Sequence, residues 1–336
     1  MRLFQTVVMR LATTAITLIG VAVIVFFVIR VVPGNPIAMM LPPGATEDDI
    51  ARLTALYGLD KSIPAQFAIW LGGVMQGDFG TSITSRQPVL ALVLGRLPAT
   101  LELSVLALGL ACVLGGIAAL TGTLRRDTRV EGAIDIGNGM ALSVPDFLWG
   151  LILILLFGVL MPVFHISGRV TPSLTLPFST NFYLIESILR LRLDLTRDIL
   201  SHMLLPALAL ALPLAAIIAQ LLKQSLKETM HLDYVTLART KGYGETHVIL
   251  REALPNAILP TLTLVGVQFT FLIGGTVIIE RLFSYEGLGN MAIDAVINRD
   301  LPLIQGIVIL FAVIFTLVNL IVDLAYAALN PRLRHG

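Results

Sequence analysis

The chain has 336 residues, of which 56% are hydrophobic and 13% charged, and its mean hydropathy is +0.87. A water-soluble domain carries more charge and fewer unbroken apolar runs, so these values exclude that class of protein. The formal net charge of +1 argues against nucleic acid as a partner. The single cysteine, Cys112, lies inside an apolar run, which excludes a disulfide framework and a thiolate metal site.

Several apolar runs are long enough to cross a bilayer, since a span takes ~20 mostly apolar residues. The predicted spans are about 11–29, 99–121, 134–163, 202–222, 261–279 and 303–329. They predict an all-α, polytopic membrane protein with six transmembrane helices. A signal peptide is the alternative for the first run, but that run is long enough to span and no small-x-small cleavage site follows it. Residues 1–30 are therefore expected to form the N-terminus and the first transmembrane helix.

The segment 31–97 is too polar to span the membrane and too regular to be an unstructured loop. Thr46, followed by acidic residues, predicts the cap of a helix that runs through Tyr57. Pro64 predicts the start of a second helix. Its apolar stripe comprises Phe67, Trp70, Leu71 and Val74. We expect a small helical segment on the outer membrane face, with an amphipathic pair of no particular role as the alternative.

Residues 98–330 form the predicted transmembrane core, followed by a tail at 331–336. Small residues recur every four positions in the second and fourth spans, and such ridges let helices approach closely. The two ridges are Ala107, Ala111, Gly115 and Ala119, and then Ala207, Ala211, Ala215 and Ala219. We expect the second ridge to contact another subunit. Glu102, near the outer end of the second span, is either a functional carboxylate or a solvated one at the interface.

The longest polar interval between two apolar blocks in the C-terminal half is Asp233–Pro260. It predicts a short helix capped by Asp233, then a turn at Gly242, where a left-handed conformation favours glycine. Val248–Ala253 predicts a second helix, and Leu254-Pro255 marks a change in its geometry. Three-and-four spacing places four residues of the first helix on or near one face. They are Tyr234, Leu237, Ala238 and Lys241.

Ala238, Gly242 and Leu254-Pro255 resemble the cytoplasmic "EAA" loop of ABC-importer permeases. The sequence of Tyr234–Gly242, Tyr-Val-x-x-Ala-Arg-x-Lys-Gly, resembles the dipeptide/oligopeptide/nickel branch of that family in particular. In the family, this loop forms a coupling helix that docks into a cleft on a separate ATPase subunit. Thr236 and Leu237 stand where other branches have Glu and Ala, so the charged contact of those branches is not implied here. An ordinary basic loop between two spans is the alternative.

Further blocks along the chain resemble the same family. They are Pro33-Gly34-Asn35-Pro36, Gly58-Leu59-Asp60, Gly77–Ser82, Arg96–Thr100, Leu142–Phe147, and Glu280, Phe283, Gly287-Leu288-Gly289, Asp300 and Pro302. Glu286 replaces the proline that is usual in the last block. The resemblance thus extends over nearly the whole chain.

The resemblance implies a permease subunit that forms half of the pathway for peptides or a related small solute. Chelated nickel, opines and glutathione-like compounds are alternative substrates of this permease type. The implied partners are a second permease subunit, two ATPase subunits or domains, an external solute-binding protein and the lipid bilayer. ATP and Mg²⁺ would be bound by the ATPases, with no cofactor in this chain. The implied location is the bacterial inner membrane, with both termini in the cytoplasm.

Two sets of site residues follow from the resemblance. The ATPase-coupling set lies in the loop 223–260 and comprises Asp233, Tyr234, Thr236, Ala238, Arg239, Lys241, Gly242, Leu254 and Pro255. Within it, Ala238 is expected to face the ATPase cleft. The candidate translocation path comprises Pro145, Phe147, Gln268, Gly274 and Gly275. The first two belong to the third span, which Ser143-Val144-Pro145 interrupts, because proline removes a helical hydrogen bond. A kink that only serves packing is the alternative for this break.

The chain lacks a Walker-type phosphate loop, His-Glu-x-x-His, Gly-x-Ser-x-Gly and Cys-x-x-Cys. Its five histidines are scattered without ligand spacing, so no metal site is expected. An intramembrane enzyme and a receptor are therefore remote alternatives. Arg125, Arg126 and Arg129 in a short loop favour a cytoplasmic side for that loop, with Arg281 and Arg299 outside. This orientation places Asp233–Pro260 in the cytoplasm.

Overall fold

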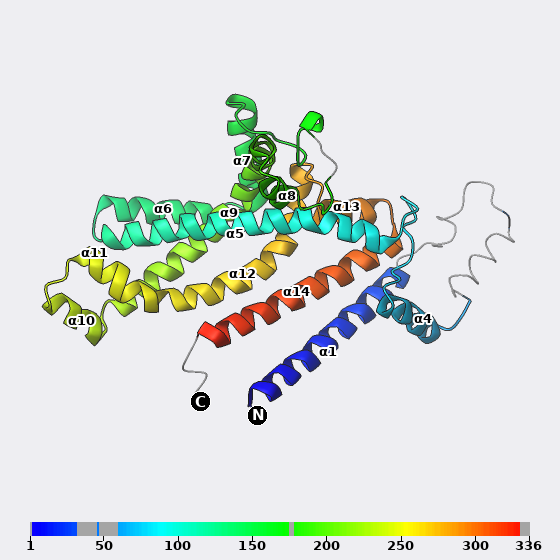
Figure 1. The fold of residues 1–336 in the computed structure, drawn as a ribbon, viewed down its shortest axis with the longest axis horizontal. Helices are drawn as coiled ribbons and strands as arrows, with labels where there is room; N and C mark the ends of the chain where they lie inside the picture. The colour runs from blue at the N-terminus through cyan, green and yellow to red at the C-terminus, as the bar shows by residue number, and fades with distance from the viewer. Residues whose placement is uncertain (1, 32–45, 47–59, 175–177, 330–336) are drawn as a thin grey trace. The chain divides into compact units, whose positions relative to one another are not determined.

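The computed structural model describes residues 2–31, 46, 60–174 and 178–329 (Figure 1). Over these residues the regular elements are helices: α1 (Arg2–Val31), α4 (Ile63–Met75), α5 (Val89–Leu124), α6 (Arg129–Ser143), α7 (Asp146–Ile154), the π-helix η1 (Leu155–Leu160), the 3-10 helix η2 (Pro172–Leu174), α8 (Tyr183–Leu189), α9 (Leu193–Thr229), α10 (Asp233–Thr240), α11 (Glu245–His247), the π-helix η3 (Val248–Ala253), α12 (Leu254–Leu282), α13 (Leu288–Ile297) and α14 (Leu301–Leu329). Apart from Thr46, the predicted helix at 46–57 lies outside the described residues, as does the tail at 331–336.

Among the described residues, four helices are long and apolar enough to cross a membrane. They are α5, α9, the continuous helix Glu245–Leu282, and α14 over Leu301–Val322. The pair α6 and Asp146–Leu160 passes the same test only together, with a bend of 104°. The remaining predicted span coincides with α1, a helix of 30 residues. The prediction of an all-α, polytopic membrane protein is confirmed.

Four helices begin well before the predicted spans. α1 begins at Arg2 instead of residue 11. α5 begins at Val89 instead of residue 99, and α9 begins at Leu193 instead of residue 202. The fifth span is already helical from Glu245 instead of residue 261. The length of an apolar run indicates how much of a helix can lie in the bilayer. The helix itself can continue into polar sequence as long as its backbone hydrogen bonds persist. Pro98, inside α5, removes one such bond without ending the helix.

The chain divides into two compact units, 1–97 with 291–320 and 98–290 with 321–336. In the first unit, the ring of Phe26 on α1 is fully buried. Its centroid lies 5.1 Å from that of Phe67 and 5.5 Å from that of Trp70, both on α4. The predicted apolar stripe of α4 thus packs on α1. Ser82 Oγ donates to Asp300 Oδ2 at 2.5 Å, which fastens the segment before α5 to the start of α14.

In the second unit, both small-residue ridges are buried. A Cβ atom built on Gly115 of α5 would lie 2.6 Å from the carbonyl oxygen of Ala215 and 2.9 Å from Cβ of Ile218, both on α9. The ridges of α5 and α9 therefore face each other. The expectation that the α9 ridge contacts another subunit is wrong, because small residues permit close approach without specifying which helix approaches.

Replacing Gly115 by Ala is expected to destabilise the chain, because a backbone carbonyl cannot move aside as a flexible side chain can. Overpacking of this kind costs ~1–3 kcal/mol, against ~0.5–1 kcal/mol gained from helix propensity. The matched control is Gly109→Ala in the same helix, where a Cβ atom meets nothing within 4 Å. Thermal unfolding of the two purified variants checks this. Equal midpoints would show that α5 and α9 have room between them.

The break in the third span lies where the sequence predicted it, at Ser143-Val144-Pro145. Val144 and Pro145 are extended, with ψ of 123° and 150°, and they turn the chain by 104° between α6 and α7. The interruption is thus a sharp corner and not a modest kink. Lys223 Nζ on α9 contacts Glu131 at 2.7 Å and Asp135 at 2.8 Å, and these ion pairs hold α6 against α9.

Candidate functional site

α10 lies at one end of α9 and α12, where the chain passes from one long helix to the other (Figure 1). Leu232 is its N-cap residue, and no side chain caps the helix. The predicted capping role of Asp233 is therefore wrong. Asp233 is instead the first helical residue, where a negative charge is favourable near the free backbone N–H groups.

One face of α10 is packed against this chain itself. Val235 is fully buried and Ala238 is 4% exposed. They join one apolar cluster with Leu226 from α9, Ile249 from η3 and Ala257 from α12, among others. The expectation that Ala238 faces an ATPase is thus wrong. Its small size instead allows α10 to lie close on η3.

The opposite face of α10 is open to the surroundings. Leu237 is 55% exposed and Tyr234 is 37% exposed, and Thr236, Arg239 and Lys241 are exposed beside them. The phenol oxygen of Tyr234 accepts a hydrogen bond of 2.9 Å from Asn256 Nδ2 at the start of α12. α10 therefore presents a mixed apolar and basic surface while its inner face and Tyr234 attach it to the base of α12.

The turn after α10 is built as the sequence predicted. Gly242 has a φ of +87°, a left-handed conformation in which any other residue is strained by ~1–2 kcal/mol. The guanidinium of Arg239 pairs with Glu245 across the turn, with Nη2 and Oε1 2.7 Å apart. The Glu245 carboxylate raises the pKa of Arg239. The ion pair joins the end of α10 to α11.

Leu254-Pro255 marks the predicted change in helix geometry. The residues before it form the π-helix η3, and the residues from Leu254 onward form α12. Pro255 lies at the first turn of α12, where its missing N–H group is least costly. The helical path is therefore continuous from Glu245 to Leu282, whereas the sequence predicted a restart at Val248.

The candidate path residues lie in two places, at the corner before α7 and on α12. Pro145 and Phe147 are exposed at the corner before α7. On α12, Gln268 is half-buried, and Gly274 and Gly275 are exposed, with open space where a Cβ atom would be added. α12 also carries Phe271, which is 65% exposed. The contacts within this chain therefore leave most of these residues exposed, and their role in a path stays a prediction.

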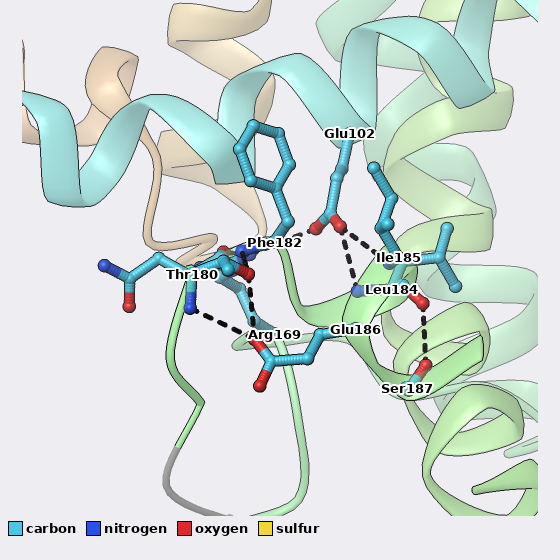
Figure 2. A network of polar contacts seen from close by, with 9 residues as sticks. Glu102, Arg169, Thr180, Phe182, Leu184, Ile185, Glu186 and Ser187 are labelled. Atoms are coloured by element: carbon cyan, nitrogen blue, oxygen red, sulfur yellow. Dashed lines mark hydrogen bonds and ion pairs between the residues drawn. The ribbon is translucent and has the colours of Figure 1, made fainter. Parts of the chain in front are cut away.

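Glu102 is not solvated, contrary to one of the sequence-based alternatives. Its side chain is 3% exposed and pairs with Arg169, whose side chain is 5% exposed, with Nη2 and Oε2 3.2 Å apart. The other oxygen, Oε1, accepts from the backbone N–H groups of Leu184 and Ile185 at 2.9 and 3.1 Å (Figure 2). One carboxylate on α5 thus ties down both the loop before α8 and the first turn of α8.

Arg169 is held from several sides. Its Cζ atom lies 3.9 Å from the ring centroid of Tyr183, a cation–π contact. It also donates to the carbonyl oxygen of Asn181 at 3.0 Å. No pattern in the sequence pairs Arg169 with Glu102, because 67 positions separate them. Arg169 is therefore a functional residue that the sequence patterns do not reveal.

A second carboxylate, that of Glu186, also holds the loop before α8 in place. Glu186 on α8 accepts from the N–H groups of Ser179 and Thr180 at 3.0 and 3.1 Å and pairs with Arg190. These hydrogen bonds, that from Ser179 first, hold the pKa of Glu186 at about 2. The carboxylate is therefore charged at any physiological pH, and the loop stays fastened.

A third carboxylate, Glu280, is fully buried at the end of α12. It accepts from Thr100 Oγ1 at 2.7 Å and from the N–H group of Asn290 at 3.0 Å. A Cβ atom on Gly287 would overlap Glu280 Oε2, and one on Gly289 would lie 3.1 Å from the same oxygen. Glycine is needed at Gly287 because the backbone passes so close to the carboxylate.

Comparison with known proteins identifies the family. Residues 111–335 match the binding-protein-dependent transport system inner membrane component family, and residues 3–104 match the N-terminal region of such membrane components. The chain belongs to this family. It is a permease subunit of an ABC importer, and such permeases are not themselves enzymes.

Individual relatives cover this permease almost completely. It is 36% identical to the dipeptide transport system permease protein DppB of Escherichia coli K12, over 99% of both chains. It is 35% identical to the di/tripeptide permease DppB of Pseudomonas aeruginosa, over 97% of both. The oligopeptide permease AppB of Bacillus subtilis is 30% identical over 95% of both.

A solved structure supports the fold of this permease. It is a crystal structure of an amino acid ABC transporter with histidines, with a TM-score of 0.50 and 16% identity. The match covers 71% of this chain and 94% of the other. At this identity the likeness concerns the fold alone.

Proposed function

We propose that this permease forms half of the pathway for di- or oligopeptides and is driven by a partner ATPase through the segment 233–255. The observation that carries the coupling proposal is the division of α10 into two faces. Its inner face packs on α9, η3 and α12, and its outer face exposes Leu237 and Tyr234. An exposed apolar surface on an otherwise polar segment is typical of a docking site.

The attachment of α10 makes it suited to transmit movement. Val235 and Ala238 bind it to the ends of two long helices, and the Arg239–Glu245 ion pair stiffens the turn. Displacement of α10 by a closing ATPase would therefore move α9 and α12 with it. Packed helices shift as rigid bodies, and such shifts expose a central path to alternate sides.

The proposed complex contains a second permease subunit, two ATPase subunits or domains and an external solute-binding protein. The ATPases would bind ATP and Mg²⁺. The complex would lie in a bacterial inner membrane, with α10 and both termini of this chain in the cytoplasm. The path between the two permeases would be lined by Pro145, Phe147, Gln268, Gly274 and Gly275.

The substrate class rests on the relatives, three of which are named for peptides. The glutathione transport permease GsiC of Salmonella choleraesuis is 34% identical over 95% of both chains, so a glutathione-like solute is the alternative. Chelated nickel and opines remain further alternatives.

Uptake by the complete importer in proteoliposomes decides among these substrates. We expect a labelled dipeptide to enter in an ATP-dependent manner, and unlabelled dipeptides to compete more strongly than glutathione. Uptake of glutathione or chelated nickel without uptake of any peptide would contradict the peptide assignment and leave the permease assignment intact.

A further inference from the structure

Three potential metal ligands gather at the beginning of α9, at the opposite end from α10. Asp198 and His202 are one helical turn apart on α9, and His165 belongs to the loop after η1. One ligand atom from each lies within 4.8 Å of the others. The two imidazole rings are stacked, with centroids 4.1 Å apart and an angle of 3° between the planes.

The hydrogen bonds decide which nitrogen of each ring is free. Nδ1 of His202 lies 2.9 Å from the carbonyl oxygen of Asp198, which can only accept, so this nitrogen carries the hydrogen. The hydroxyl of Ser201 donates to the same carbonyl oxygen at 2.6 Å. Nδ1 of His165, 2.7 Å from Ser201 Oγ, must therefore donate to it. When Nδ1 of a neutral imidazole carries the hydrogen, Nε2 carries the lone pair that can bind a metal ion.

The Asp198 carboxylate is also held in place. Its two oxygens accept from the N–H group and the hydroxyl of Thr171 at 2.8 and 2.6 Å. Each carboxylate oxygen still has a second lone pair available. The side chains of Asp198 and His202 are 9% and 4% exposed, whereas His165 is exposed and gives access from outside.

We propose that His165, Asp198 and His202 bind one divalent transition-metal ion of the Zn²⁺ class. Two imidazole nitrogens and one carboxylate oxygen, completed by water, are a usual ligand set for this ion. Hydrogen bonds that fix the other ring nitrogen and the carboxylate are typical of such sites. The proposal does not depend on the transported substrate or on the coupling role of α10.

Metal binding requires a small movement. The lone pairs of two parallel rings do not meet at one point, so one ring must tilt, and the exposed His165 on its loop can do so. The bound ion would then join this loop to α9. Arg169, four residues farther along the same loop, already connects it to α5 through the ion pair with Glu102. The metal ion would therefore add a second contact that holds this loop in place.

The test uses the purified, tag-free chain in detergent after treatment with a chelator, because a polyhistidine tag would itself bind Zn²⁺. Zn²⁺ is titrated in competition with a chromogenic chelator. We expect one tight site per chain, weakened at least tenfold in His165→Ala. Ser201→Ala, which removes the acceptor for His165 Nδ1, should weaken it as well, as the loss of such partners does in metal sites. His231→Ala is the matched control and should bind like the unaltered chain.

Replacing His165 removes its stacking on His202 and its hydrogen bond to Ser201, so each protein is compared with its own metal-free thermal midpoint. Zn²⁺ should raise that midpoint in the unaltered chain and not in His165→Ala. Binding of equal strength in the two proteins would overturn the proposal. Binding of Zn²⁺ only at millimolar concentration would do so too.

Discussion

Replacing Leu237 by Asp is expected to abolish ATP-driven uptake while the chain stays inserted at normal abundance. Leu237 is 55% exposed on the outer face of α10, so the folded chain tolerates a charge there. In the proposed ATPase cleft, the carboxylate would lose its water without gaining a partner. The apolar contact of Leu237, ~1.5–3 kcal/mol for a fully buried leucine, would be lost as well.

The measurements are uptake in proteoliposomes and retention of the ATPase during purification in detergent. Thr246→Asp is the matched control, because Thr246 is exposed outside α10 and should tolerate the charge. Ala238→Asp should behave differently from both. It places a charge in the buried cluster of this chain and should lower abundance. Normal uptake by the Leu237→Asp variant would show that α10 is only a connector.

Replacing Arg169 by Met is expected to destabilise the second unit strongly. The change leaves the buried carboxylate of Glu102 without its counter-charge, and breaking a buried pair from one side costs ~3–5 kcal/mol. The thermal midpoint of the purified chain should fall by on the order of 10 °C. The loop before α8 should also become more susceptible to proteolysis.

Arg192→Met supplies the matched control. Arg192 and Asp194 form an ion pair in which the side chains are 44% and 53% exposed, and pairs so open to solvent contribute little to stability. The double variant Glu102→Gln with Arg169→Met should lose less stability than the sum of the single changes, since it leaves no unpaired charge. Equal midpoints for Arg169→Met and Arg192→Met would refute the structural role of the buried pair.

Features that depend on neighbouring residues could be predicted from the sequence. The break at Ser143-Val144-Pro145 follows from proline chemistry, and the positive φ of Gly242 follows from the turn after a short helix. The apolar stripe of α4 follows from helical spacing. Among the described residues, hydropathy likewise located the long helices. The starts of α1, α5, α9 and the fifth span were misplaced, because a helix does not stop where the apolar sequence stops.

The contacts between distant segments could not be predicted in this way. A small-residue ridge permits close packing with any helix, and only the structure shows α5 opposite the α9 ridge. Ala238 was placed on a helix correctly, but the direction of its side chain depends on where η3 and α9 lie.

The sequence by itself determined the all-helical membrane architecture, the position of the break before α7, the short helix α10 and the family to which the chain belongs. Each of these is encoded in runs of adjacent residues, whose hydropathy and backbone preferences act locally. Only the tertiary structure decided that Glu102 is buried beside Arg169 and that His165 lies against His202. These pairings join residues far apart in the chain, and they form only because the tertiary structure brings the loop after η1 against α5 and α9.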